Sequence, residues 1–319
     1  MADNRPVLAI DVGGTKIAAG VVDRRGRVVA LDRVPTPQGR RVNADTLWRT
    51  LETVLDRVVA EYGRRRGFAG VGVGCSGPMT WPSGEVSPLN IPGWVGFPLR
   101  KMLSERFPRC VVRMHNDAVT MAVGEHWRGA GQGVADMLGI VVSTGVGGGL
   151  VLGDRLVNGA SGNAGHVGHI VVEPDGPDCV CGGKGCLEAV AAGPALVRWA
   201  RERGWRESQR KTPTARDLSV DAARGHEVAS AALRRGGVAL GRAIASATAL
   251  CDVDVVAVGG GLSQAGPLLF EPAEDAFRTH AGMEFMQKVR IVPATLGQQA
   301  GLVGAAALVL GEDTYWPGD

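Results

Sequence analysis

Apolar and polar positions along the chain form short strand-like runs separated by longer stretches with helical spacing. Three β-rich runs between residues 7 and 34, joined by glycine-containing turns, predict an antiparallel meander. Residues 43–66 then place their apolar side chains on one helical face, with Asn43 as a candidate cap and Gly67 as a candidate stop. We expect this helix to pack onto the core.

The pattern continues through the rest of the chain. Residues 68–75 and 110–114 are predicted strands, and residues 99–107 a short helix. Residues 76–98 form a long loop rich in proline and glycine, and loops of that length inside compact domains are usually functional. Further helices are expected at 193–203, 215–223, 229–250 and 298–310, the last apolar enough to pack back onto the core.

Apolar strands lead directly into glycine-rich turns at three places. After the first strand, Asp11 precedes the turn Gly13-Gly14-Thr15-Lys16. The turn amides and the threonine hydroxyl can hold phosphate, and Asp11 can face a magnesium ion or its waters. A plain tight hairpin is the alternative at this turn.

The second turn contains Thr144 and Gly145 and follows a strand predicted near residues 137–142. It resembles the first in pattern, which suggests two related domains that close on one polyphosphate. The third turn, with Gly260 and Gly261, follows the strand near residues 253–258 and could receive a nucleotide base or ribose. One glycine loop is weak evidence, whereas three, each after an apolar strand, favour nucleotide binding.

Three cysteines and a histidine have the spacing of a metal site. Cys179, Cys181 and Cys186 lie within eight residues, and His169 precedes them by ten. Their number and type match a closed tetrahedral zinc site, with disulfides or inert thiols as the alternatives. Cys179 and Cys181 are too close in the chain to pair comfortably. His166 and Glu188 flank the predicted zinc as polar groups without a structural duty, as expected beside a binding site.

Two further places carry candidate polar groups. Asn116 and Asp117 end a predicted strand, where α/β proteins place their chemistry, although helix capping explains such a pair equally well. Asn90, in the long loop, is either a ligand contact or a turn former.

Composition narrows the class of protein. The chain has 319 residues, 45% hydrophobic and 21% charged, which fits a soluble protein with two domains. The 48 glycines are about twice the usual share. A net charge of +3 is too small to indicate nucleic acid or an anionic membrane as partner, and residues 64–66 are predicted to be a solvated helix end. Six cysteines without a signal-peptide pattern or a membrane span predict a cytoplasmic protein.

Together these motifs resemble the signature set of the ROK sugar kinases (repressor, open reading frame, kinase). The resemblance covers nearly the whole chain in the right order. It implies an α/β, actin/hexokinase-like (ribonuclease H-like) two-domain kinase fold with an interdomain cleft. It also implies phosphate transfer from ATP with Mg²⁺ to a hexose hydroxyl, a structural Zn²⁺, and a homodimer or dimer of dimers. The expected small domain comprises residues 1–118 completed by 298–319, and the large domain comprises 119–297.

The resemblance also implies roles for individual residues. Asp117 is the expected catalytic base, and His169 and the three cysteines the expected zinc ligands. The expected sugar-binding set is Gly77, Asn90, Asn116, Asp117, His166, His169 and Glu188. The expected ATP- and magnesium-binding set is Asp11, Gly13, Gly14, Thr15, Lys16, Thr144, Gly145, Gly260 and Gly261.

His166 departs from the glucokinase-like pattern, which has glutamate there. A neutral imidazole both accepts and donates a hydrogen bond, which suits an acetamido group. The sequence Ala-Gly-His-x-Gly-His is similar to that of bacterial N-acetylmannosamine kinases, so we favour an N-acetylmannosamine 6-kinase over a glucokinase or broad hexokinase. His166 as a variant without effect on substrate choice stays open. Repressors of the family carry an N-terminal helix-turn-helix, for which six residues before the first strand leave no room. A catalytically inactive sugar sensor is the remaining alternative.

Overall fold

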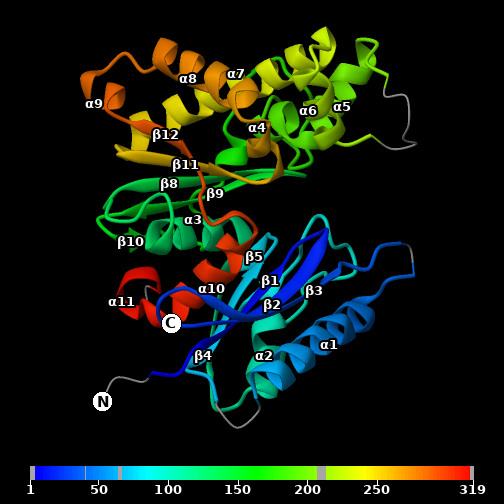
Figure 1. Cartoon of the computed structure of the whole chain (residues 1–319), viewed down its shortest axis with the longest axis vertical. Coiled ribbons are helices and arrows are strands. Elements are labelled where there is room, and N and C mark those ends of the chain that lie inside the picture. The colour runs from blue at the N-terminus through cyan, green and yellow to red at the C-terminus, as the bar shows by residue number, and fades with distance from the viewer. Residues whose placement is uncertain (1–3, 40, 64–66, 207–212, 317–319) are drawn as a thin grey trace. The chain divides into compact units, whose positions relative to one another are not determined.

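The computed structural model describes residues 4–39, 41–63, 67–206 and 213–316. The chain divides into two compact units (Figure 1). The first unit contains Met1–Ala135, Gly149–Gly165 and Leu296–Asp319, and the second contains Asp136–Gly148 and His166–Thr295. The helix end predicted at residues 64–66 lies outside the described residues.

The first unit is built on a five-stranded sheet with the order β3-β2-β1-β4-β7. β1 (Val7–Val12), β2 (Lys16–Val22) and β3 (Val28–Pro35) pair antiparallel, which confirms the predicted meander. β4 (Gly70–Cys75) and β7 (Val111–Asn116) extend the sheet with parallel pairing. β7 continues past the predicted end at residue 114, because His115 and Asn116 still pair with the end of β4.

Helices cover both faces of this sheet (Figure 1). Leu8 and Ile10 of β1 share one apolar cluster with α1 (Ala44–Tyr62) and α2 (Leu99–Arg106), whereas alternate residues of β1 pack with α10 (Ala300–Leu310). Asn43 caps α1 through its side chain, as predicted. The predicted stop at Gly67 is wrong: α1 ends at Tyr62, since Gly63 has a φ of 105° and its N–H donates to the carbonyl of Val59.

The C-terminal helix α10 fixes the position of α3 (Asp117–Arg128) by close backbone contact. A Cβ atom on Gly304 would lie 1.6 Å from the carbonyl oxygen of Thr120, so no larger residue fits there. The first unit also contains α11 (Glu312–Tyr315), η3 (Gly297–Gln299) and a hairpin of β5 (Met79–Thr80) and β6 (Glu85–Val86) within the predicted long loop.

The other five-stranded sheet has the order β10-β9-β8-β11-β12. Its strands are β8 (Met137–Val142), β9 (Val146–Leu152), β10 (Arg155–Leu156), β11 (Val255–Gly259) and β12 (Arg290–Pro293), and the division between the units falls within β9. Counted along the chain, both sheets place their strands in the order third, second, first, fourth, fifth. This repeated topology agrees with the similarity of the two glycine turns.

The second unit carries its helices mainly after the metal-site segment. α5 (Gly193–Glu202), α6 (Ala215–Ala223) and α7 (Glu227–Cys251) confirm three predicted helices. The structure adds α4 (Leu187–Ala191), α8 (Pro267–His280), α9 (Glu284–Gln287), η1 (Val167–His169) and η2 (Gly261–Ala265). Within the described ranges, none of the helices has the length and apolarity needed to cross a bilayer.

Candidate active site and zinc centre

Asp117 lies where β7 passes into α3 and is held at both carboxylate oxygens. Its Oδ2 accepts a hydrogen bond from the hydroxyl of Ser76 at 2.7 Å, and its Oδ1 accepts one from the N–H of Ala118 at 2.8 Å. The capping role belongs to Asn116, whose Oδ1 accepts from the same N–H of Ala118 at 3.0 Å. Asp117 is therefore not needed as the cap.

Burial is the main influence on the charge of Asp117, and it raises the pKa to about 6. The hydrogen bond from Ser76 lowers this pKa, whereas the negative charge of Asp11 raises it further. A carboxylate with a pKa just below neutrality is largely ionised at pH 7 yet basic enough to accept a proton, which is the requirement for a general base.

Three other predicted sugar-binding residues gather around Ser76 and Asp117. The amide nitrogen of Asn90 lies 3.5 Å from the Ser76 hydroxyl. A Cβ atom on Gly77 would lie 2.7 Å from the amide nitrogen of Asn116, so a larger residue there would displace that amide. Among the described residues, that Asn116 nitrogen donates no hydrogen bond, and it is available to a ligand.

The first glycine turn is closed by backbone and side-chain hydrogen bonds. The N–H of Gly13 donates to the carbonyl of Lys16 at 2.9 Å, and the Thr36 hydroxyl donates to the carbonyl of Gly13 at 2.6 Å. Lys16 lies 3.3 Å from Asp11 as an ion pair. Burial raises the pKa of Asp11, and Lys16 opposes that change. A divalent cation would favour the ionised carboxylate further, and oxygen ligands are what magnesium prefers, so Asp11 fits the predicted role.

The turn between β8 and β9 is held by Glu188. Its Oε2 accepts a hydrogen bond from the N–H of Val146 at 2.8 Å, and a Cβ atom on Gly145 would lie 2.7 Å from that oxygen. The third turn lies beside the second within the same unit. Gly260 has a φ of 92°, and a Cβ there would lie 2.3 Å from the carbonyl oxygen of Val142. The structure thus brings together Thr144, Gly145, Gly260 and Gly261.

The predicted metal ligands converge. The ligand atoms of His169, Cys179, Cys181 and Cys186 all lie within 4.8 Å of one another. Cys181 Sγ is 3.8 Å from Cys186 Sγ, and His169 Nδ1 is 3.8 Å from Cys179 Sγ. A tetrahedron with zinc–sulfur bonds of about 2.3 Å places its ligand atoms about 3.8 Å apart. The donor set therefore fits zinc, and all three thiols are free rather than paired as disulfides.

Glycine shapes the loop that carries these thiols. Gly185 has a φ of 68°, and a Cβ there would overlap the carbonyl oxygen of Glu173. Glu173 in turn forms an ion pair with Arg235 of α7 at 2.6 Å. Beside the metal site, the His166 and His169 rings are stacked with centroids 6.1 Å apart and planes inclined by 19°.

Two residues that the sequence analysis did not select join the network around Asp117. One is Ser76, which follows β4 directly. The other is His115, which is buried: its Nδ1 accepts from the N–H of Asn116 at 2.9 Å, and its Nε2 lies 2.7 Å from Oδ1 of Asn158. No local feature of the sequence marks Ser76, because it reaches Asp117 through the parallel pairing of β4 with β7, which ends both strands at the same sheet edge.

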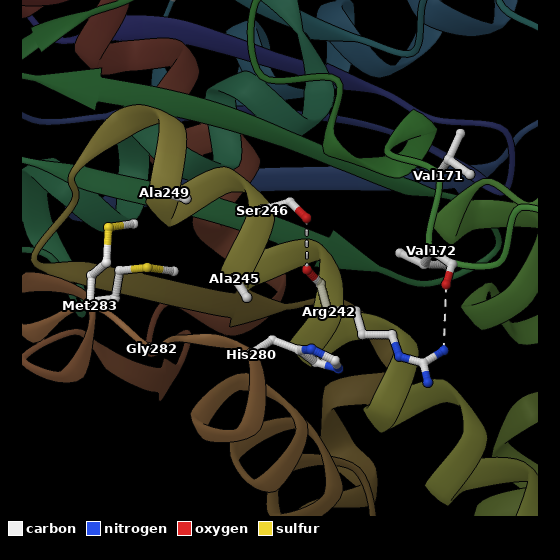
Figure 2. A pocket seen from close by; sticks show the side chains of 10 residues that line it. Val171, Val172, Arg242, Ala245, Ser246, Ala249, His280, Gly282 and Met283 are labelled. Carbon is white, nitrogen blue, oxygen red and sulfur yellow. Dashed lines mark hydrogen bonds between the residues drawn. The ribbon is translucent and has the colours of Figure 1, made fainter.

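Each unit carries a surface pocket, and Asp117 lines neither of them. One, of about 500 Å³, is on the second unit between α7 and the segments near Val171 and His280 (Figure 2). Arg242 points across it and donates to the carbonyl of Val172 at 3.4 Å. The other, of about 390 Å³, adjoins the first glycine turn and includes Lys16. The larger pocket contains none of the predicted site residues.

Comparison with known proteins identifies the family. The model of the ROK family matches residues 7–312. The glucokinase of Streptomyces coelicolor is 35% identical over 317 residues, covering 94% of this chain and 96% of that protein. The N-acetylmannosamine kinase of Shigella flexneri is 33% identical over 312 residues, covering 96% of this chain and 99% of that protein.

A solved structure gives the same result at the level of the fold. The ROK family glucokinase from Streptomyces griseus, in complex with glucose and AMPPNP, is 34% identical. The match has a TM-score of 0.80 and covers 95% of this chain and 98% of that one. Sequence and fold agree over nearly the full length, and the chain therefore belongs to the ROK family.

Proposed function

We propose that this chain is an ATP-dependent sugar kinase that phosphorylates the 6-hydroxyl of N-acetylmannosamine or a related hexose. Kinases of the ROK family match it over nearly its full length. The observation that carries the proposal is the Asp117 carboxylate, held by Ser76 and Ala118 at the start of α3, with a pKa of about 6.

The chemistry requires a base because a sugar hydroxyl is a poor nucleophile. Asp117 accepts the proton of the 6-hydroxyl while that oxygen forms a bond to the γ-phosphorus of ATP. The bond from the γ-phosphorus to the bridging oxygen breaks, and ADP leaves with its electron pair. General-base assistance of this kind contributes a factor of about 10²–10⁴.

The glycine turns supply the phosphate contacts in this proposal. The turn at Gly13 and Gly14 and the turn at Thr144 and Gly145 present backbone N–H groups to the transferring phosphoryl and its neighbours. Asp11 would hold magnesium or its waters, and the ion would neutralise part of the phosphate charge. Gly260 and Gly261 receive the nucleoside.

The sugar contacts in this proposal come from amide, imidazole and carboxylate groups. Asn90 and Asn116 supply amide groups, and Glu188 keeps Oε1 without a partner among the described residues. His169 and the three cysteines would hold zinc, and the bound ion would fix the orientation of the His169 ring without a role in phosphate transfer.

Two sugars are the leading candidates. His166 favours N-acetylmannosamine, because its imidazole offers both a donor and an acceptor to an acetamido group. Identity favours glucose slightly, at 35% for the glucokinase against 33% for the N-acetylmannosamine kinase. That difference is too small to choose a substrate, so the sugar needs a direct test.

The test is a coupled ADP-release assay with magnesium and ATP. The assay is repeated with polyphosphate as the phosphate donor, and the phosphorylated sugar is then detected directly because no ADP is released. The sugars are N-acetylmannosamine, glucose, mannose and N-acetylglucosamine, with Asp117→Asn as the blank. A kcat/KM for N-acetylmannosamine at least tenfold above glucose, about 1.4 kcal/mol, supports the role of His166. A preference for glucose keeps the kinase and rejects that role. No turnover with any sugar rejects the kinase and favours a sugar sensor.

A further inference from the structure

We propose that Ser76 is a positioning residue for the reaction: its hydroxyl holds the Asp117 carboxylate in place and favours its ionised form. This inference rests on the proposed function for the role of Asp117 as base. It concerns only residues of the first unit. Ser76 touches the base and not the reacting atoms.

The groups around Ser76 determine the direction in which its hydroxyl donates a hydrogen bond. The side chain is buried, with 4% of the residue exposed, and its backbone N–H donates to the carbonyl of Val12 at 2.9 Å. The Asn90 amide nitrogen, a donor, approaches the hydroxyl oxygen at 3.5 Å. An ionised carboxylate only accepts, so the hydroxyl proton lies toward Asp117, at an oxygen–oxygen distance of 2.7 Å.

Ser76 and the helix start together fix the orientation of the base. Oδ1 of Asp117 accepts from the Ala118 N–H, and Oδ2 accepts from Ser76. Each carboxylate oxygen has two acceptor sites and uses one of them here. Each oxygen therefore keeps one site that can accept the proton of the sugar hydroxyl. Without Ser76, the hydrogen bond from Ala118 is the one that remains to this carboxylate among the described residues, and Oδ2 can rotate away from the substrate.

The Ser76 hydroxyl also influences whether Asp117 is protonated, because it acts against the other groups around that carboxyl. Asp11 on β1, itself paired with Lys16 on β2, is the charged group that acts on Asp117. Cys75 on β4 is neutral, because burial raises its pKa well above the ordinary value. His115 on β7 accepts a hydrogen bond at Nδ1 from the backbone N–H of Asn116. Burial favours the protonated acid, as does the Asp11 carboxylate when no magnesium ion neutralises it, and Ser76 opposes them.

The expected size of this effect is measurable. Each hydrogen bond to a carboxylate lowers its pKa by about one unit. Loss of the Ser76 hydroxyl therefore raises the pKa of Asp117 above its value of about 6. Near pH 6 the ionised fraction falls about fivefold, whereas near pH 9 it is unchanged.

The experiment compares wild type, Ser76→Ala and Ser76→Thr, with Ser83→Ala as a matched control. The hydroxyl of Ser83, in the same loop, bonds only to the carbonyl of Thr80. The pH profile of kcat/KM for the sugar is measured for each. In parallel, ¹³C NMR follows the aspartate carboxyl carbons, with Asp117→Asn identifying the signal of Asp117.

We expect Ser76→Ala to move the acid limb and the NMR midpoint upward by about one unit and to lower kcat at every pH. Ser76→Thr, which keeps a hydroxyl, should restore both, and Ser83→Ala should match wild type. An unchanged NMR midpoint in Ser76→Ala overturns the proposal, as does a rate loss that is uniform across pH. Because NMR does not depend on turnover, a shifted midpoint in a protein that phosphorylates no sugar would reject the proposed function while keeping the Ser76–Asp117 interaction.

Discussion

Replacing Asp117 by asparagine should abolish catalysis and stabilise the fold at the same time. Burial raises the pKa of this carboxyl from 3.8 to about 6. A change of one unit corresponds to about 1.4 kcal/mol, so the ionised side chain costs the folded state about 3 kcal/mol above pH 6. Asparagine carries no charge and avoids that cost, but its amide loses part of the interaction with Ser76. A net gain of about 1–3 kcal/mol is therefore expected near pH 7.5.

The sign of the effect gives it a pH signature. The pKa is higher in the folded than in the unfolded chain, so the destabilisation is absent below about pH 4, where both states are protonated. It grows between pH 4 and 6 and is complete above that range. The stability advantage of Asp117→Asn should follow this course, and wild type and variant should converge at the acid end.

Urea unfolding at about pH 7.5 and about pH 4.5 measures the difference in stability, and the coupled ADP assay measures turnover. We expect turnover to fall by a factor of about 10² or more, the usual contribution of a general base. The argument from burial is refuted if Asp117→Asn is less stable than wild type at the higher pH. It is also refuted if the difference in unfolding free energy between variant and wild type is the same at both pH values. Turnover above a hundredth of wild type would refute the role as base.

Three further predictions concern other parts of the proposed site. Metal analysis should find about one zinc per chain, and Cys186→Ser should lose it and raise the sugar KM; a folded wild-type protein without metal contradicts the centre. His166→Glu should shift the kcat/KM ratio toward glucose, and an unchanged ratio makes His166 irrelevant to substrate choice. Asn158→Ala should destabilise the chain by about 1–3 kcal/mol in urea, since it removes the 2.7 Å contact between Oδ1 of Asn158 and Nε2 of the buried His115. Asn158→Asp keeps the acceptor and should be closer to wild type; equal losses would rule out this hydrogen bond as the cause.

Features that depend on residues close in the chain could be predicted from the sequence. The meander of β1 to β3 follows from short turns, and the Asn43 cap from its position before an apolar helical face. The metal cluster of His169 and the cysteines follows in the same way, because ligand spacing within about twenty residues largely determines which side chains meet.

Features that depend on tertiary packing could not be predicted. Ser76 and Asp117 are 41 residues apart, and only the parallel pairing of β4 with β7 brings them together. The end of α1 was misplaced because both Gly63 and Gly67 adopt positive φ, and sequence alone does not show which of them terminates the helix. Helix α8 was not predicted. It packs closely on α7 because Gly237 and Gly241 have no side chains, and the local sequence does not indicate that these glycines face another helix.

Gly14 and Gly145, in the two proposed phosphate-binding turns, are explained by tertiary contacts rather than by local backbone conformation. Their presence first suggested sharp turns, yet neither Gly14 nor Gly145 has a positive φ. A Cβ on Gly14 would instead lie 2.6 Å from the side-chain carbon of the Asn90 amide, and one on Gly145 would lie 2.7 Å from Oε2 of Glu188. In each unit, then, a proposed sugar-binding side chain packs directly against a proposed phosphate-binding turn. Neither turn can gain a side chain without displacing the residue beside it, so a substitution at either glycine should disturb the proposed sugar contacts as well as the proposed phosphate contacts.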